Sequence, residues 1–264
     1  MKGFDPVIFD LDGTVVDTVE LIRESFRHAS RVVLGAQLPD DVLMAGVGRP
    51  LMTQMEALDA DRAQELYDTY REHNHRVHDD LIASFEGMEA ALGRLRAAQR
   101  RLAIVTSKSA QTTDMAFRAV GLRDYFQTVV TATDTDAHKP SPEPILLALE
   151  RLGATAQRAV YVGDAPVDVT AGRAAGVATI AVTWGAFAVA ALAAAGPGFV
   201  VATPAALADL CLHGPDAPAN EGSGRGDGGV RRGGDPTVGG PTSGGAAGDD
   251  PTAAEDTGRQ GSGP

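Results

Sequence analysis

Two spacings of apolar residues divide the first 213 positions of the chain. Short apolar runs, typical of buried parallel strands, alternate with segments whose apolar residues recur every three or four positions, typical of amphipathic helices. After a first run at 7–9, strands are predicted at 102–107, 128–133, 159–164, 178–184 and 199–202. Helices are predicted between and after them, at 88–100, 110–120, 144–152, 167–175, 186–195 and 204–212. This alternation indicates an α/β fold with a Rossmann-like, doubly wound parallel sheet.

The segment from residue 17 to residue 84 has a different pattern. Its apolar positions follow the helical period in three stretches, which begin near Val19, Leu51 and Leu66, and none of them has the pattern of a strand. We therefore expect an all-helical domain at 17–84, inserted into an α/β core made of 1–16 and 85–213.

The last 51 residues, 214–264, differ in composition from everything before them. They hold 16 Gly and 6 Pro and no Leu, Ile, Met or aromatic residue. A segment of this composition cannot bury enough apolar surface to offset its ordering entropy, so we predict a disordered tail. The tail carries 8 acidic and 4 basic residues, so it supplies −4 of the net charge of −12.

Net charge limits the classes of binding partner that are expected, and cysteine content bears on the cellular location. The remaining 213 residues carry −8, which argues against nucleic acid or an anionic membrane as a partner. Cys211 is the single cysteine, and the N-terminus has acids where an export signal needs an apolar core, so a cytoplasmic location is expected. The uncharged stretch 177–195 is rich in Ala and is better explained by a strand and a helix than by a membrane span. The sequence leaves the oligomeric state open.

Polar residues collect where the predicted strands end. Asp10 and Asp12 follow the first strand on the same side, and two acids so placed are costly unless a cation or a reaction uses them. Thr106 ends the second predicted strand, and Asp164 ends a later one. Lys139, one of three lysines in the chain, lies in the loop after 128–133. In a doubly wound sheet ligands bind at these carboxyl ends, so one site is predicted there.

These motifs resemble the four motifs of the haloacid dehalogenase-like hydrolase superfamily: Asp10-Leu11-Asp12-Gly13-Thr14, Thr106, Lys139-Pro140 and Gly163-Asp164-Ala165-Pro166-Val167-Asp168. The resemblance runs from about residue 7 to 212. The helical insertion resembles the C1 cap of that superfamily. Three further motifs are similar to the phosphoglycolate phosphatase-like branch: Val16-Asp17-Thr18, Gly48-Arg49-Pro50 and Trp184-Gly185.

The resemblance implies a role for each motif residue in transfer of a phosphoryl group through an aspartyl-phosphate. Asp10 is expected to be the nucleophile and Asp12 the general acid and base. Mg²⁺ would be held by Asp10, the backbone carbonyl of Asp12 and Asp164. Thr106 would hold a phosphoryl oxygen, and Lys139 would offset the charge of the nucleophile and the phosphate.

Four further residues belong to this prediction. Asp168, one helical turn after Asp164, is expected to orient Lys139 or a metal-bound water rather than to bind the metal. Ser107, Lys108 and Arg49 are candidate substrate contacts. The motif residues also have ordinary structural interpretations: Thr106 as a threonine at the end of a strand, Lys139 as a solvated lysine in a loop, and Asp164 and Asp168 as caps of the following helix.

The histidines of the helical segment are a separate candidate for metal binding. His73, His75 and His78 are interpreted as polar positions of a helix rather than as a zinc site, because 73 and 75 do not share a face.

The residues also favour one reaction over its relatives. True haloacid dehalogenases lack an acid two positions after the nucleophile, so Asp12 favours ester hydrolysis. The first expectation is a Mg²⁺-dependent phosphatase acting on a small phosphorylated metabolite, with 2-phosphoglycolate as the nearest analogue. Two alternatives remain open: an inorganic pyrophosphatase of the same family, and a catalytically silent phosphate-binding regulatory module.

Overall fold

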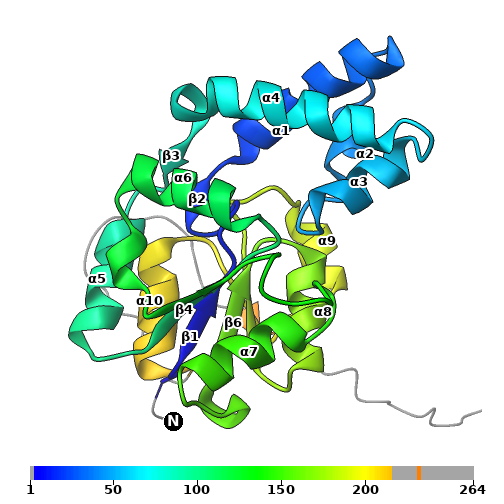
Figure 1. Cartoon of the computed structure of the whole chain (residues 1–264). Helices are drawn as coiled ribbons and strands as arrows, with labels where there is room; N and C mark the ends of the chain where they lie inside the picture. Colours follow the sequence, from blue (N-terminus) through cyan, green and yellow to red (C-terminus); the bar gives the residue numbers. More distant parts are fainter. Residues whose placement is uncertain (1–2, 216–230, 233–264) are drawn as a thin grey trace, which may run out of the picture. The chain divides into compact units, whose positions relative to one another are not determined.

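The computed structural model describes residues 3–215 and 231–232, and a parallel β-sheet is its central element (Figure 1). The strand order is β5-β4-β1-β6-β7-β8-β9, and all neighbours pair in parallel except β8 and β9. The strands are β1 Val7–Phe9, β4 Leu102–Val105, β5 Thr128–Val130, β6 Val160–Gly163, β7 Ala178–Val182, β8 Phe199–Val201 and β9 Arg231–Arg232. The helices between them are α5 Met88–Ala97, α6 Ala110–Val120, α7 Glu143–Arg151, α8 Pro166–Ala174, α9 Val189–Ala194 and α10 Pro204–His213.

The six parallel strands and the helices between them confirm the predicted doubly wound α/β fold. Several boundaries were predicted wrongly: β4 ends at Val105 rather than at 107, α5 at Ala97 rather than at 100 and β7 at Val182 rather than at 184. Two further boundaries have a local cause. β5 ends at Val130 rather than at 133, because Asp134 accepts hydrogen bonds from the backbone N–H and the hydroxyl of Thr131 and turns the chain. α9 begins at Val189 rather than at 186, because the backbone of Ala188 is extended, with φ −63° and ψ 146°, which is not a helical conformation.

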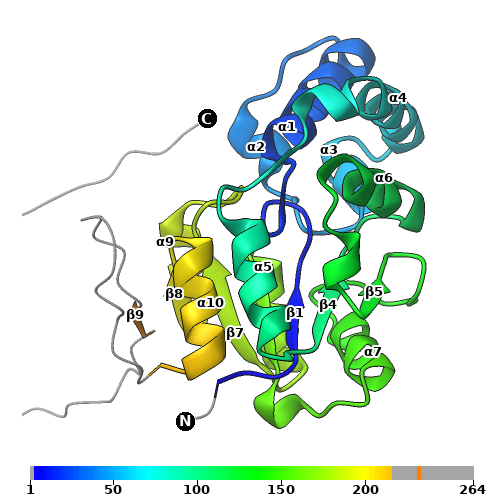
Figure 2. The same ribbon diagram turned by 90° about the vertical axis from the view of Figure 1, so that its left-hand side faces the viewer.

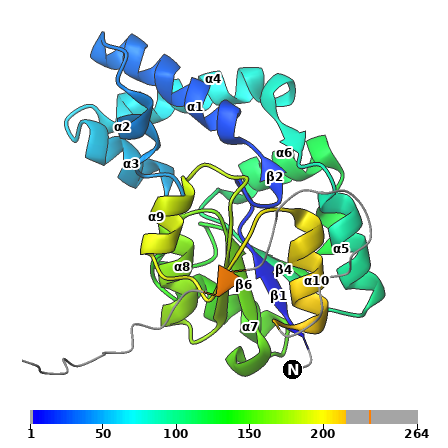
Figure 3. The same ribbon diagram turned by 180° about the vertical axis from the view of Figure 1, so that it is seen from behind.

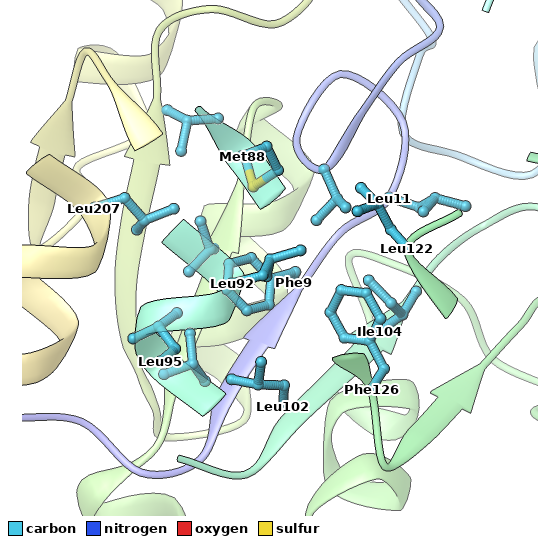
Figure 4. Close-up of a cluster of buried hydrophobic side chains, with 14 of the residues drawn as sticks. Phe9, Leu11, Met88, Leu92, Leu95, Leu102, Ile104, Leu122, Phe126 and Leu207 are labelled. Carbon is cyan, nitrogen blue, oxygen red and sulfur yellow. The ribbon is translucent and has the colours of Figure 1, made fainter. Parts of the chain in front are cut away.

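Alternation along β1 distributes its side chains between two apolar layers. Phe9 packs on one face of the sheet with residues of α5 and α10, including Leu92 and Leu207 (Figure 4). Ile8 points to the other face and packs with residues of α7 and α8. Figure 2 shows α5 and α10 side by side on the first of these faces. Burial on both faces explains why β1 reads as a continuous apolar run.

The helical insertion, residues 17–84, has an apolar cluster of its own. Its helices are α1 Val19–Ala29, the π-helix Ser30–Leu34, α2 Asp40–Met44, α3 Leu51–Leu58 and α4 Ala63–Leu81. α1 and α4 lie side by side (Figures 1 and 3), and Phe26 meets Tyr70 edge to face at 4.9 Å between ring centroids. The helical character is as predicted, but the five-residue α2 was missed because it is too short to show a period.

Two short strands join the insertion to the sheet domain. β2, Val16–Asp17, enters the insertion and β3, Ala83–Ser84, leaves it, and the two pair antiparallel with Val16 opposite Ser84. The expectation that 17–84 contains no strand was wrong at these two ends, because pairing between the crossings depends on the fold and not on a local pattern. The domain boundaries at 17 and 84 stay predictions.

Most of the predicted tail, 214–264, lies outside the described residues. Within it the structure describes 214–215 and the two residues of β9, whose backbone pairs antiparallel with β8. Among the helices in the described part of the chain, none is long and apolar enough to cross a membrane.

Candidate active site

Asp10, Thr106 and Asp164 directly follow the carboxyl ends of the central strands β1, β4 and β6. Asp10 follows β1, and its backbone N–H donates to Val162 of β6 at 2.8 Å. Thr106 follows β4, and its backbone N–H donates to Val130 of β5 at 2.9 Å. These bonds extend the sheet ladder one residue beyond each strand, so both backbones are fixed by the sheet rather than by a loop.

Lys139 joins two of the acids. Its Nζ lies 2.8 Å from Asp10 Oδ1 and 2.7 Å from Asp168 Oδ1, and all three side chains are buried. Asp168 also accepts from the backbone N–H of Ala165 through Oδ2, at 3.0 Å, and from the Tyr161 hydroxyl at 3.4 Å. Both oxygens of Asp168 therefore accept hydrogen bonds, and Asp168 is the second acid, after Asp10, that holds the Lys139 ammonium.

Asp164 lies in a tight cradle. It accepts from the Ala186 backbone N–H at 2.7 Å and from the Thr14 hydroxyl at 3.4 Å. A Cβ added at Gly13 or at Gly185 would collide with the Asp164 carboxylate. Gly13 also has a φ of 69°, a left-handed conformation that glycine adopts without strain. The two glycines thus let the chain pass on both sides of this carboxylate.

Burial disfavours the charged forms of Asp10 and Asp164. It raises the pKa of the Asp10 carboxyl to about 7, against the opposing effect of Lys139. It also raises the pKa of Asp164 well above its usual value, and the nearby charges of Asp168 and Asp10 add to this. Burial alone would lower the pKa of the Lys139 ammonium, but Asp10 and Asp168 outweigh it and hold that pKa well above its usual range. One lysine therefore faces three buried acids.

This excess of negative charge fits a divalent cation. Asp10, Asp164 and Asp168 each offer a carboxylate oxygen, and these oxygens lie within 4.8 Å of one another. Because Lys139 and Ala165 already engage Asp168, the residues that would hold the ion are Asp10 and Asp164. The Asp12 carbonyl accepts no backbone hydrogen bond within the described residues and is a third candidate. An all-oxygen set with few carboxylates is what Mg²⁺ prefers.

Asp12 is held in a different way from the other acids. Its Oδ1 accepts from the Thr18 hydroxyl at 2.7 Å and from Lys108 Nζ at 2.5 Å, and its side chain is 17% exposed. No hydrogen bond reaches its Oδ2 from the described residues. Asp12 therefore keeps one oxygen available at the edge of the buried group.

A cavity of about 290 Å³ brings these residues together with the helical insertion. Of the predicted site residues, all but Asp168 line it: Asp10, Asp12, Arg49, Thr106, Ser107, Lys139 and Asp164. The insertion supplies one face of α4, with Tyr67, Tyr70, Arg71, Asn74 and His75 at helical spacing, and apolar residues that include Phe26, Leu51 and Met52. The loop at 46–50 reaches the core, where the Ser107 hydroxyl donates to the Gly48 carbonyl at 2.7 Å.

Sequence reasoning missed several of these contacts. The pattern marks Tyr161 only as part of a buried strand, yet its hydroxyl donates to the Val105 carbonyl at 3.0 Å and supports Asp168. The motif around Thr18 gives no sign of its bond to Asp12. His75 stands out only as part of a histidine cluster. No local signal marks such residues, but the α4 face could have been found from the spacing of its polar and aromatic positions.

The chain is similar to known hydrolases along most of its length. Residues 7–182 match the family model described as haloacid dehalogenase-like hydrolase. A pyrophosphatase PpaX from Bacillus velezensis is 38% identical over 183 residues, which is 69% of this chain and 85% of that protein. Its counterpart from Bacillus cereus is 36% identical over 178 residues, 67% of this chain and 82% of that protein.

Solved structures with the same fold match over nearly their whole length. The crystal structure of a predicted phosphatase from Clostridium acetobutylicum is 26% identical with a TM-score of 0.70, covering 78% of this chain and 97% of that one. A predicted phosphoglycolate phosphatase from Haemophilus somnus is 21% identical with a TM-score of 0.73, covering 80% and 99%, which shows likeness of fold alone.

Proposed function

The chain belongs to the haloacid dehalogenase-like hydrolase family, and from this premise we propose that it is a Mg²⁺-dependent phosphatase of a small phosphomonoester, with 2-phosphoglycolate as the nearest analogue. As a member of this family it is a phosphoric ester hydrolase. The finer proposal concerns its substrate, its metal and the roles of its residues.

In the proposed first step, a carboxylate oxygen of Asp10 attacks phosphorus in line with the leaving oxygen. An Asp–phosphorus bond forms, the bond to the leaving oxygen breaks, and Asp12 gives that oxygen a proton. In the second step a water attacks the aspartyl-phosphate, Asp12 takes its proton, and Asp10 is released. The one free oxygen of Asp12 suits both transfers.

The other residues stabilise charge and hold position. Lys139 offsets the negative charge of Asp10 and the phosphoryl group, and Asp168 keeps its ammonium in place. Thr106 would donate to a phosphoryl oxygen from the end of β4. Mg²⁺, held by Asp10, Asp164 and the Asp12 carbonyl, would supply charge neutralisation at the phosphoryl group when bound.

The observation that carries the proposal is the buried group formed by Lys139, Asp10 and Asp168. Lys139 lies 2.8 Å and 2.7 Å from acids of two separate elements, and Asp164 lies beside them. Burying these charges has a high desolvation free energy. Phosphoryl transfer makes use of this arrangement, because that reaction needs a positioned carboxylate and concentrated positive charge. A silent phosphate-binding module would have no use for the nucleophile.

Inorganic pyrophosphate is the second candidate substrate. The relatives named pyrophosphatase favour it, as do the cationic residues Arg49 and Arg71 that line the cavity. The apolar residues that the insertion contributes, such as Phe26 and Met52, favour an organic group instead. We place the phosphomonoester first for this reason.

The test compares turnover of 2-phosphoglycolate, inorganic pyrophosphate and 4-nitrophenyl phosphate by the full chain with Mg²⁺. Asp10→Asn should lose at least about 10⁴-fold in kcat/KM for every substrate, because the nucleophile is gone. Asp124→Asn, which changes an exposed acid of the short helix at Arg123–Tyr125, is the matched control and should keep full activity. Equal, negligible rates in the wild type and Asp10→Asn would favour the silent module.

A further inference from the structure

Lys108 forms the shortest of the contacts to Asp12, and no step of the proposed reaction uses it. Its Nζ is 2.5 Å from Asp12 Oδ1, and the two side chains are only 14% and 17% exposed. In the cavity wall the Lys108 ammonium therefore contacts Asp12, and not the two buried acids that pair with Lys139. An ion pair this short and this sheltered is a charge-assisted hydrogen bond that fixes geometry.

The backbone of Lys108 is itself fixed from two sides. Its N–H donates to the Thr106 hydroxyl oxygen at 3.2 Å, and its carbonyl accepts from the backbone N–H of Ala132 at 2.8 Å. The residue before it, Ser107, donates to the Gly48 carbonyl of the insertion. Lys108 thus contacts both Asp12 and the Thr106 hydroxyl, and its neighbour Ser107 contacts the insertion.

Both partners of Asp12 bind the same oxygen. Because Lys108 and Thr18 donate to Oδ1, the carboxylate cannot rotate without breaking two short hydrogen bonds. Oδ2 is then the oxygen that can carry a proton, and its direction is set by the pair. A general acid acts only when its proton lies within hydrogen-bond reach of the leaving oxygen, so fixing this direction matters to the rate.

We propose that Lys108 is a positioning residue which fixes Asp12 through Oδ1, so that Oδ2 exchanges the proton with the leaving group. This inference rests on the proposed function, since it assumes that Asp12 is the acid and base. In the first step the proton on Oδ2 passes to the leaving oxygen as the bond from phosphorus breaks. In the second step Oδ2 takes a proton from the attacking water, which returns Asp12 to its starting state.

The test uses the dependence of the rate on the leaving group. Phenolate is a poor leaving group and needs the proton, whereas 2,4-dinitrophenolate leaves readily without it. We expect Lys108→Met to lower kcat/KM for phenyl phosphate about 30-fold and for 2,4-dinitrophenyl phosphate less than about threefold. Comparing kcat/KM confines the measurement to the steps from substrate binding up to departure of the leaving group, and so excludes hydrolysis of the aspartyl-phosphate. Lys108→Arg should recover most of the phenyl phosphate rate, because it restores a cationic donor.

Two controls separate this role from others. Arg71→Gln removes another cation of the cavity wall, and it should change both substrates by the same factor. In a double-mutant cycle, Lys108→Met should cost nothing further when Asp12 is already Asn. Thermal melting with Lys108→Gln as a second variant checks that the fold is intact.

Each contrary result has a definite meaning. An equal loss on both substrates would show that Lys108 binds the phosphate, and no loss on either would show that Asp12 needs no such support; both overturn the inference. If Asp12→Asn shows the leaving-group dependence and Lys108→Met does not, only this inference fails. If Asp12→Asn itself lacks the dependence, the role of Asp12 in the proposed function fails as well.

Discussion

The two walls of the cavity differ in the burial and the pairing of their side chains. The wall at the sheet consists of short acids and a lysine whose side chains are buried and paired, with Asp10 and Lys139 each 3% exposed. The wall from the helical insertion consists of longer side chains on α4 and of the loop at 46–50, where Arg49 is exposed. From this difference we expect the buried wall at the sheet to carry the chemistry and the insertion wall to recognise the rest of the substrate.

Metal removal should affect the sheet wall most. We expect EDTA to abolish turnover and added Mg²⁺ to restore it, because two buried acids would lose their counter-ion. Asp164→Asn should raise the Mg²⁺ concentration that half-restores activity by at least about tenfold. Assays of turnover against free Mg²⁺ measure both effects. Full activity in the absence of any divalent metal would contradict the assignment.

Loss of the lysine is the next largest change. Lys139→Met leaves Asp10 and Asp168 without their shared partner, so kcat/KM should fall about 10³-fold. The free energy of unfolding should fall by about 3–5 kcal/mol, as is typical when one partner of a buried ion pair is removed. Urea denaturation together with steady-state kinetics checks both numbers. Unchanged stability would mean that the buried acids do not depend on Lys139.

The insertion wall should respond more mildly, in KM rather than in kcat. For Arg49→Gln we expect KM to rise about 10-fold while kcat stays within about twofold, because a contact made equally to substrate and transition state is lost. Measuring this variant with 2-phosphoglycolate and with pyrophosphate shows which of them Arg49 contacts. A fall in kcat alone would place Arg49 with the sheet wall instead.

The smallest expected effect is a pH-dependent difference in stability without metal. Burial raises the pKa of Asp10 from 3.8 to about 7, so ionising it costs more in the folded than in the unfolded protein, and the penalty develops as the pH rises from about 4 to about 7. In EDTA, Asp10→Asn should therefore melt higher than the wild type at pH 8, with the advantage vanishing towards pH 4.

Asp134 provides the control of opposite sign for that measurement. Burial works against it, but hydrogen bonds from Thr131 and Arg151 lower its pKa. Its contribution to stability is present above about pH 3.8 and is lost as the pH falls through the lower, folded-state value. Asp134→Asn should thus melt lower than the wild type at pH 8, with the deficit shrinking in acid. Melting curves that shift in the same direction for both variants would refute the explanation.

The same division between walls explains what the sequence could predict. The strand ends follow from apolar runs and from the rule that ligands bind at the carboxyl ends of parallel strands, so the sequence alone could place Asp10, Thr106, Lys139 and Asp164 at one site. Resemblance to a family supplied the roles expected of them. The backbones of Asp10 and Thr106 are fixed by sheet pairing, which the periodicity reports directly.

The remaining contacts could not be predicted because they arise between elements distant in sequence. The bond from Lys108 to Asp12 joins positions 96 residues apart, and Tyr161 reaches Val105 across 56 residues. A buried strand residue and a loop lysine carry no mark of such partners. The short α2 and the β2–β3 pair escaped for a related reason, since elements of two to five residues show no period.

The pairing of β2 with β3 has a consequence for how this protein could be remodelled. Since Val16 lies opposite Ser84, the polypeptide departs from the sheet domain and returns to it through neighbouring strands. A tight turn could therefore replace the whole segment between those two residues without changing the length or the order of any strand in the seven-stranded sheet. A miniature made in this way would keep the acids and Lys139 but lose the opposite wall and the Thr18 donor to Asp12, and it would offer an open end of the sheet on which foreign recognition modules could be grafted.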